Sequence, residues 1–265
     1  MSSPKSPEDQ QSGEDRGDLS GDLRSVLVTS VLNLELLDQD LFRGRHYWVP
    51  TTQRLFGGQI VGQALVAAAK SASFQQTQPS PVMHQFSMPA APPPEELLDH
   101  DTLIDKYLSD PDLKEKYRVG LNRIAAQDVP IEVKLVNPPT VGQLQRMEPK
   151  QMFWVRARGY IGEGDIKMHC CVAAYISDYA FLGTAMLPHH WKYEVKFMAS
   201  LDHSMWFHAP FRADHWMLYE CDSPWTGGSR GMVQGRLWRR DGVLAVSCAQ
   251  EGVIRVKPCI SDSKL

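Results

Sequence analysis

The chain has 265 residues, of which 43% are hydrophobic, and its formal net charge is −3. This length suffices for one large or two small domains with a packed core. A charge so close to neutral gives no overall field for nucleic acid, and no stretch reaches the roughly 18 apolar residues of a membrane span. We therefore expect neither a nucleic-acid partner nor a membrane span.

The cysteines indicate reduced, buried, structural thiols rather than a disulfide framework. Their number, five, is odd, two of them are adjacent at 170 and 171, and no C-x-x-C occurs. A zinc site needs clustered cysteine and histidine at short spacing, which this sequence lacks. We therefore predict that the chain holds no metal.

Both ends of the chain are polar. Residues 1–22 are rich in Ser, Pro, Gly, Asp and Glu, which predicts a disordered tail, and they lack the apolar stretch of a secretory signal. The tail 261–265 ends in Ser263, Lys264 and Leu265, the tripeptide that the peroxisomal import receptor reads. We expect that receptor as a partner and the peroxisome matrix as the location; a coincidental match in a frayed tail is the alternative.

Residues 23–76 predict one helix and little sheet. A short helix or strand and then a strand lead into an Ala-rich helical pattern over 55–70. Its apolar stripe consists of Ile60, Val61, Ala64, Leu65 and Ala68. The helix either docks on the later unit, residues 130–260, or leaves this stripe exposed. Gly58 and Gly62 lie four residues apart and favour close packing, because the spacing of a phosphate-binding loop is missing.

The remaining chain predicts an α+β unit behind a connecting segment. Residues 77–129 are Pro-rich and then helical, which is typical of a linker with a connecting helix. Residues 130–260 indicate two strands, a long helix over 166–186 and four antiparallel strands, the first over 198–208. One long helix followed by a strand meander predicts a sheet wrapped around that helix.

Polar side chains at unusual positions mark a candidate site in this unit. Asp178 shares a helix stripe with small and apolar residues, so its carboxylate needs partners unless the helix is rotated toward solvent. Gln250 lies late in the last strand, where a buried amide needs partners unless the strand is at an edge. His203 and His208 could act as bases, but no G-x-S-x-G motif accompanies them, which favours structural roles.

Several stretches resemble the type II acyl-CoA thioesterases. They are Leu55-Phe-Gly-Gly-Gln-Ile-Val-Gly-Gln, Ser177-Asp-Tyr-Ala-Phe, Leu201-Asp-His-Ser-Met-Trp-Phe-His, Arg230-Gly-Met-Val-Gln-Gly and Gln250-Glu-Gly-Val-Ile-Arg. The resemblance implies an α+β double hotdog, in which each of two repeats is a long helix wrapped by an antiparallel sheet. It also implies hydrolysis of fatty acyl-CoA, and of bile-acid CoA as a further candidate, to free acid and CoA.

The family's catalytic residues fall on Asp178, Ser200 and Gln250, a triad that resembles a serine esterase in residue types. The resemblance implies that they hold a water molecule and that no cofactor is needed, since CoA is part of substrate and product. It gives no CoA-binding residues and leaves a homo-oligomer open.

One departure from the family concerns the first repeat. After the helix that ends near Lys70, the block of strands that should follow is missing, so residues 23–76 predict a truncated first repeat beside a complete second one, 130–260. The alternative function is therefore an inactive or weakly active shortened form that acts only as a folded or partner-binding module. A hotdog hydratase or dehydratase is a third and weaker alternative.

Overall fold

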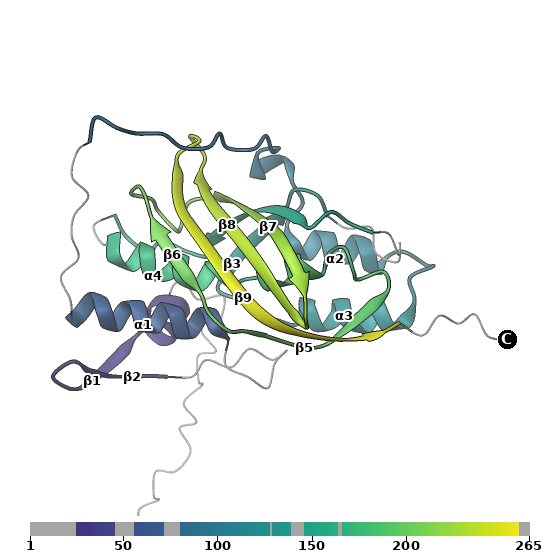
Figure 1. The fold of residues 1–265 in the computed structure, drawn as a ribbon, viewed down its shortest axis with the longest axis horizontal. Coiled ribbons are helices and arrows are strands. Elements are labelled where there is room, and N and C mark those ends of the chain that lie inside the picture. Colours follow the sequence, from purple (N-terminus) through teal and green to yellow (C-terminus); the bar gives the residue numbers. More distant parts are fainter. Residues whose placement is uncertain are drawn as a thin grey trace, which may run out of the picture.

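The structure is a computed structural model that describes residues 25–45, 56–71, 80–127, 129–138, 146–163 and 166–259. The predicted tails, 1–22 and 261–265, lie outside these ranges, so the predicted targeting tripeptide has no structural description. Within them, one antiparallel sheet of seven strands dominates the molecule (Figure 1). A separate two-stranded hairpin and several helices complete it.

The large sheet has the order β3-β4-β7-β8-β9, and β5 and β6 both pair with β9. Its strands are Ile131–Leu135 (β3), Lys150–Ala157 (β4), Tyr193–Ser200 (β5), Ser204–Phe207 (β6), Met217–Gly227 (β7), Arg230–Arg239 (β8) and Leu244–Pro258 (β9). The predicted hairpin turn between β8 and β9 is confirmed, with Gly242 at a φ of 84°. β9 is thus a central strand, paired along both sides.

Helix α4 (Ile166–Ser177) forms the centre of the core, as predicted, but it is shorter than predicted. Its residues from Cys171 to Ser177 are all buried, because apolar side chains point outward in every direction. The helix ends at Ser177, and a turn leads to the 3-10 helix η3 (Leu182–Met186). Ala180 in that turn has a φ of 56°, a left-handed conformation that the α-helix cannot contain. The expectation of one helix over 166–186 was therefore wrong.

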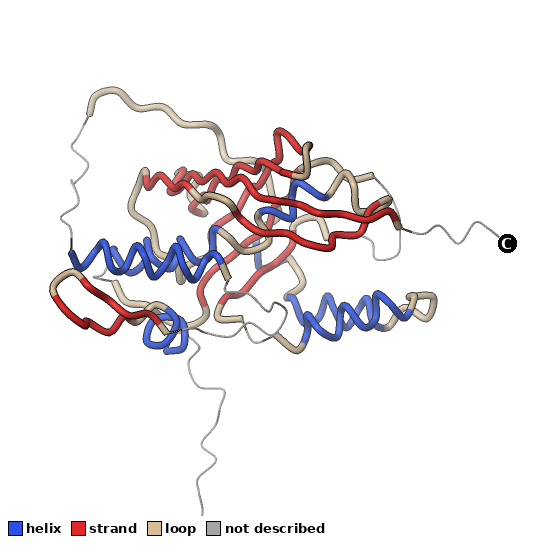
Figure 2. The backbone as a smooth tube through the Cα atoms, turned by 60° about the horizontal axis from the view of Figure 1, so that its bottom comes forward, coloured by secondary structure: helices blue, strands red, loops and turns tan. Residues whose placement is uncertain are grey.

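The N-terminal residues dock onto α4. They form the π-helix η1 (Ser25–Val31), the hairpin strands β1 (Leu34–Asp38) and β2 (Leu41–Gly44), and helix α1 (Gly57–Ser71). In Figure 2 the strands of the large sheet form one layer and α1 lies alongside it. A Cβ on Gly62 would lie 3.3 Å from the carbonyl oxygen of Cys171, and one on Gly58 would lie 2.5 Å from that of Tyr175. The two glycines therefore allow the backbones of α1 and α4 to approach each other.

Helix α1 docks onto α4 with a different face from its apolar stripe. Ile60 is 50% exposed, whereas Gly58, Gly62 and Val66 are buried at a spacing of four residues. The reason is that close backbone contact selects the face with the smallest side chains, and hydrophobicity alone does not identify that face. The predicted packing role of the glycines agrees with this arrangement.

The segment before the second unit lies across the outer face of the large sheet. The Gln85 side chain bonds to the backbone of both Gly242 and Leu244, and Trp154 Nε1 donates to the carbonyl of Pro92 at 2.8 Å. A second apolar cluster forms beneath it, made of Trp154, Leu218 and Trp238 with Met88, Ala91 and Leu97. The segment then continues through η2 (Pro94–Glu96), α2 (His100–Leu108) and α3 (Glu115–Ala125).

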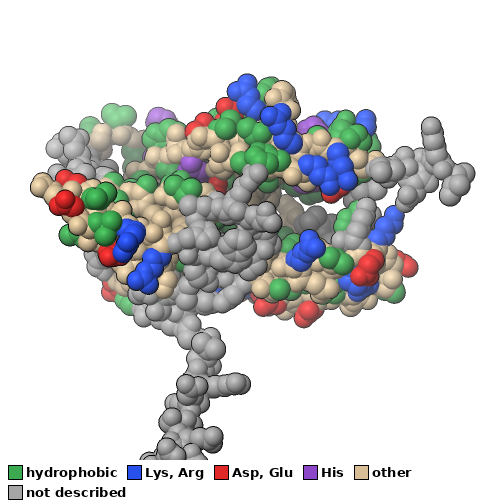
Figure 3. All heavy atoms as spheres, turned by 90° about the horizontal axis from the view of Figure 1, so that it is seen from below, with side chains coloured by type: hydrophobic (Ala, Val, Ile, Leu, Met, Phe, Trp, Pro, Cys, Tyr) green, Lys and Arg blue, Asp and Glu red, His purple; other side chains and the backbone are tan. Residues whose placement is uncertain are grey.

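Acidic and basic side chains intermingle on the described part of the face drawn in Figure 3. In the described ranges no helix is long and apolar enough to cross a membrane. The same ranges contain no group of three or more His, Cys, Asp or Glu side chains suited to a metal ion. All five cysteines are described and free. Cys171, Cys221 and Cys248 are buried, as predicted, whereas Cys170 is partly buried and Cys259 is exposed, so the prediction of a buried thiol is wrong for Cys259.

Candidate active site

Four segments that are distant in sequence meet at the carboxylate of Asp178. Gln250 Nε2, from β9, donates to Asp178 Oδ1 at 2.6 Å, and the backbone N–H of Gly58, in the first turn of α1, donates to Oδ2 at 2.8 Å. The hydroxyl of Ser200, at the end of β5, lies 3.5 Å from Oδ1, which is the outer limit of a hydrogen bond. The structure thus brings together all three residues predicted from the resemblance.

The environment of Asp178 disfavours its charged form. Burial raises the pKa of this carboxyl above 3.8, although the Gln250 amide, the His203 ring and the Gly58 N–H each act to lower it. Within the described part of the chain, the three groups that donate to the carboxylate are neutral. A carboxylate held in this way is a stronger base than an exposed aspartate, and it still faces partial solvent access.

Ser200 lies directly before a bend that was not predicted from the sequence. The predicted single strand over 198–208 is divided, because residues 201–203 leave the ladder between β5 and β6. The backbone N–H groups of Leu201 and Asp202 both point to the carbonyl of Glu251, and Asp202 Oδ1 accepts from the N–H of Glu251. The bend leaves the Ser200 side chain exposed and turned toward Asp178.

Gln250 is buried in the central strand, so the alternative of an edge position is excluded. Its side chain is 1% exposed, and both hydrogens of its amide are used, one by Asp178 and one by His203 Nδ1 at 2.9 Å. Its oxygen Oε1 is buried and accepts no hydrogen bond from any described residue. A buried carbonyl oxygen of this kind is suited to accept from a water or a ligand.

The histidines of the 200–210 run do not form a serine-histidine-aspartate relay. His203 bonds to Gln250 and to the hydroxyl of Ser177, and His208 bonds to Ser247 at 2.9 Å. Neither ring has a hydrogen bond to Ser200 among the described contacts. The geometry therefore supports activation of water by Asp178 better than activation of Ser200 as a nucleophile.

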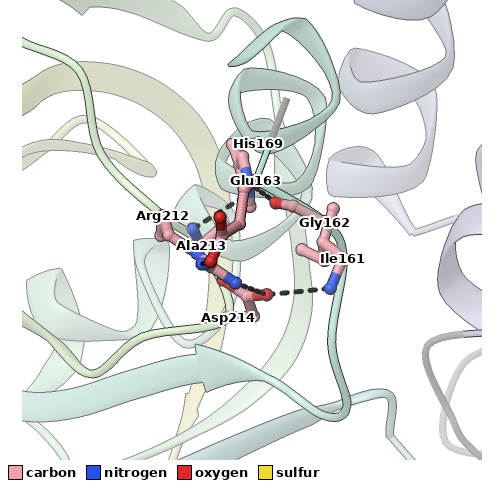
Figure 4. Close-up of polar contacts among 7 residues, drawn as sticks. All are labelled: Ile161, Gly162, Glu163, His169, Arg212, Ala213 and Asp214. Atoms are coloured by element: carbon pink, nitrogen blue, oxygen red, sulfur yellow. Dashed lines mark hydrogen bonds and ion pairs between the residues drawn. The ribbon is translucent and has the colours of Figure 1, made fainter. Parts of the chain in front are cut away.

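Helix α4 is fixed at its other end by a separate polar network (Figure 4). His169 accepts from the N–H of Ala213 at Nδ1 and bonds to the carbonyl of Gly162 at Nε2. Arg212 binds both oxygens of Asp214, at 3.0 and 2.9 Å, and Asp214 also accepts from the N–H of Ile161. These contacts tie the loop before α4 to the segment before β7, which sets where the helix begins.

Two contributors to the site were not predicted. One is the N–H of Gly58, a residue that was interpreted, together with Gly62, as a packing feature. The other is the Tyr219 hydroxyl, which holds the carbonyl of Ser177 at 2.6 Å, directly before Asp178. A glycine pair that opens a helix could have identified Gly58, whereas nothing in the sequence indicates the contact of Tyr219.

Comparisons with known proteins agree with this arrangement. The family model of the acyl-CoA thioesterase C-terminal domain matches residues 104–254. Acyl-coenzyme A thioesterase 8 is 67% identical in Mus musculus and 66% identical in Homo sapiens, with 100% of both chains covered. Acyl-CoA thioesterase 2 of Haemophilus influenzae is 30% identical, over 85% of this chain and 96% of the bacterial one.

The alignments with the mammalian proteins also show a difference in length. They run over 320 positions, 55 more than the 265 residues of this chain, although both chains are covered from end to end. The difference is therefore internal, which agrees with the predicted shortening.

Solved structures confirm the predicted α+β double-hotdog fold class. A crystal structure of acyl-CoA thioesterase II TesB2 from Mycobacterium marinum aligns with a TM-score of 0.61 at 25% identity, over 87% of this chain and 98% of that one. A tesB protein of Mycobacterium avium subs paratuberculosis aligns with a TM-score of 0.64 at 21% identity, over 88% and 99%. The second likeness concerns the fold alone.

Proposed function

This chain belongs to the acyl-CoA thioesterase family, and we propose that it hydrolyses acyl-CoA by means of a water molecule held by Asp178, Ser200 and Gln250. The observation that carries the proposal is the meeting of these side chains at one carboxylate. Burial raises the pKa of that carboxyl toward the range in which a general base works well.

The reaction needs one proton acceptor and no covalent enzyme intermediate. Asp178 takes a proton from the water as the water oxygen attacks the thioester carbonyl carbon, whose π electrons move onto its oxygen. The tetrahedral intermediate then expels sulfur as the carbon–sulfur bond breaks, and the proton on Asp178 passes to that sulfur. The products are the free acid and CoA, and Asp178 is again a carboxylate.

The neighbouring groups orient this water and stabilise charge. The Ser200 hydroxyl is exposed beside Asp178 and can bond to the same water, and Gln250 Oε1 is a buried acceptor. The first turn of α1 directs the N–H of Gly58 to the Asp178 carboxylate, and the positive end of the helix dipole favours the oxyanion that develops on the substrate. The shortened first repeat therefore retains one element of the proposed machinery.

The substrate class follows from relatives that are named acyl-CoA or acyl-coenzyme A thioesterases. We propose fatty acyl-CoA as the main substrate class and bile-acid CoA as a second one. We also propose that the protein acts in the peroxisome matrix. The support for the location is the terminal Ser263, Lys264 and Leu265.

Turnover of the purified chain tests the chemical proposal. Release of CoA from medium- and long-chain acyl-CoA is measured with a thiol reagent, next to an Asp178→Ala variant whose fold is checked by circular dichroism. We expect the variant to lose a factor of about 10² to 10⁴ in kcat, as for removal of a general base. Equal rates for the two proteins would disprove the proposed role of Asp178.

The alternative function, a weakly active or inactive module, is favoured by one observation. Leu36, Leu37 and Leu41 of the β1–β2 hairpin are 64%, 48% and 54% exposed, which leaves apolar surface that a partner could cover. A cooperative melt, a monodisperse particle and turnover abolished by Asp178→Ala would together exclude this alternative. Measurement of the particle's mass in solution also decides whether the chain is a homo-oligomer.

Import is tested separately from catalysis. A fusion with a fluorescent protein at the N-terminus should accumulate in peroxisomes, and deletion of Leu265 should leave it in the cytosol. Unchanged peroxisomal fluorescence after the deletion would refute the targeting role of the tripeptide and would leave the chemical proposal untouched.

A further inference from the structure

His203 connects the proposed catalytic amide to the end of α4. Its Nδ1 lies 2.9 Å from Gln250 Nε2, and its Nε2 lies 2.8 Å from the hydroxyl of Ser177, the residue before Asp178. We propose that His203 is a positioning residue that fixes the Gln250 amide in the orientation required for hydrolysis. The inference rests on the proposed function and deepens it.

The carboxylate determines which way the amide faces. A carboxylate oxygen can only accept, so the atom of Gln250 that lies 2.6 Å from Asp178 Oδ1 must be the nitrogen. Its second hydrogen then needs another acceptor, and His203 Nδ1 is that acceptor. With both hydrogens used, Oε1 is held in one direction as a buried acceptor for the proposed water. Without Nδ1, the amide can rotate and Oε1 moves.

The same contacts define the protonation of the ring. Because Nδ1 accepts from the amide, the proton of a neutral ring is on Nε2, from which it is donated to the Ser177 hydroxyl. Ser177 in turn donates to the carbonyl of Ala174, one turn earlier in α4. The chain of donors runs in one direction, from the Gln250 amide through His203 and Ser177 to the backbone of α4, and every hydrogen in it has an acceptor.

The ring is also held by its position in the fold. His203 belongs to the bend that carries Ser200, and Phe181, from the turn after α4, contacts the ring edge with centroids 6.0 Å apart. The bend, the end of α4 and β9 are therefore linked through one imidazole. A change in His203 should move the amide of Gln250 without touching Asp178 directly.

Protonation of the ring would break this arrangement. A doubly protonated His203 would place an N–H against the N–H of the amide, so the Gln250 contact needs the neutral ring. Burial lowers the pKa of His203, and the charges of Asp178, at the end of α4, and Asp202, in the bend, act in the opposite direction. Among the described residues these two carboxylates are the charged groups that influence the ring.

Three variants test the role by turnover. His203→Leu removes the acceptor at similar volume, His203→Asn places Oδ1 near the position of Nδ1, and His208→Asn is the matched control from the same run. We expect His203→Leu to lower kcat by about 10- to 100-fold, as a small misplacement does, with KM within twofold of the parent value. His203→Asn should recover most of kcat, and His208→Asn should keep it.

The acid side of the pH–rate profile is a second readout. In the parent chain two groups, Asp178 and His203, must lose a proton for activity, so kcat should fall with a slope approaching two at low pH. His203→Asn should fall with a slope of one. Equal kcat for His203→Leu and the parent, or a slope unchanged in His203→Asn, would overturn the positioning role.

A spectroscopic measurement separates this inference from the proposed function. The nitrogen-15 shifts of the His203 ring, assigned by comparison with His203→Asn, should show Nδ1 unprotonated and Nε2 protonated at neutral pH. A protonated Nδ1 would contradict the proposal whether or not the chain is active or His203→Leu folds. Absence of turnover above Asp178→Ala would instead contradict the proposed function alone.

Discussion

An aspartate and a histidine lie at each end of helix α4, but the hydrogen-bond partners of the two pairs differ in kind. At the beginning, Asp214 is bound through both oxygens by the Arg212 guanidinium, which, with the N–H of Ile161, lowers the pKa of its carboxyl against the effect of burial. At the end, the described residues that donate to Asp178 are all neutral, and burial raises the pKa of that carboxyl.

The histidines show the same contrast. His169 is held between two backbone groups, the N–H of Ala213 and the carbonyl of Gly162, and it therefore ties two loops together. His203 is held between two side chains, those of Gln250 and Ser177, and one of these belongs to the proposed site. A guanidinium and backbone partners make the first end a structural anchor. Neutral partners leave the second end with a carboxylate that can accept a proton.

The largest effect that tests this contrast is the pH dependence of turnover. Because the pKa of Asp178 is raised above 3.8, kcat should begin to fall at a pH above that value and decrease at least tenfold per pH unit below the inflection. The measurement is a pH–rate profile in buffers of constant ionic strength. An acid inflection at or below 3.8 would show that Asp178 does not act as the buried base.

A change at the other end of the helix should affect stability and spare catalysis. Asp214→Asn removes a carboxylate that accepts charge-assisted hydrogen bonds, so we expect a loss of about 1.5–3 kcal/mol in the free energy of unfolding at neutral pH. The value of kcat at a temperature where the variant is folded should be unchanged. Chemical denaturation followed by fluorescence measures the first quantity.

The two aspartates should change the free energy of unfolding in opposite directions as the pH rises. The pKa of Asp214 is lowered by folding, so its contribution is complete above 3.8 and disappears as the pH falls through the lowered value. The pKa of Asp178 is raised by folding, so ionisation of Asp178 costs stability as the pH rises above 3.8. A difference between the parent and Asp214→Asn that stays constant down to the lowest accessible pH would contradict the anchor role.

Gly58→Ala tests whether the end of α4 depends on the close approach of α1. The new Cβ would lie 2.5 Å from the carbonyl oxygen of Tyr175, which belongs to backbone and cannot move away freely. We expect a loss of about 1–3 kcal/mol in stability, as for overpacking, and a lower kcat because the N–H shifts away from Asp178.

Gly62→Ala is the matched control for that change. Its Cβ would meet the end of the Leu32 side chain at 2.7 Å and lies one turn further from Asp178 along α1. Leu32 can rearrange, so we expect a smaller loss of stability and an unchanged kcat. Equal effects of the two alanines on kcat would mean that α1 acts on the site only through packing.

Part of this architecture could be predicted from the sequence. Asp178 stood out because its stripe includes Cys171, Ala174 and Phe181, all of which are buried in the structure. Gln250 stood out as an amide in a strand of small residues, and the strand is central. In both cases a polar group at an apolar position carries the signal, since its burial must be compensated.

The rest depends on backbone geometry that residue patterns do not report. Nothing in Ser177-Asp-Tyr-Ala-Phe predicts that Ala180 adopts a positive φ and ends the helix, because glycine or proline usually marks such a point. The bend at residues 201–203 likewise interrupts the strand predicted over 198–208. Regular structure would have directed the catalytic candidates Asp178 and Ser200 elsewhere. The two irregular points bring them to the site.

The smallest expected effect concerns a glycine that contacts nothing. Gly120 lies in α3, and a Cβ at this position would meet no heavy atom within 4 Å. Gly120→Ala should therefore raise the free energy of unfolding by about 0.5–1 kcal/mol, because alanine loses less backbone entropy in a helix. Equilibrium denaturation measures the gain, and kcat should stay the same. A loss of stability would show that α3 is packed more closely than its contacts indicate, whereas a gain beside the loss in Gly58→Ala shows that the effect of an added Cβ depends on what it meets, the backbone of α4 at Gly58 and open space at Gly120.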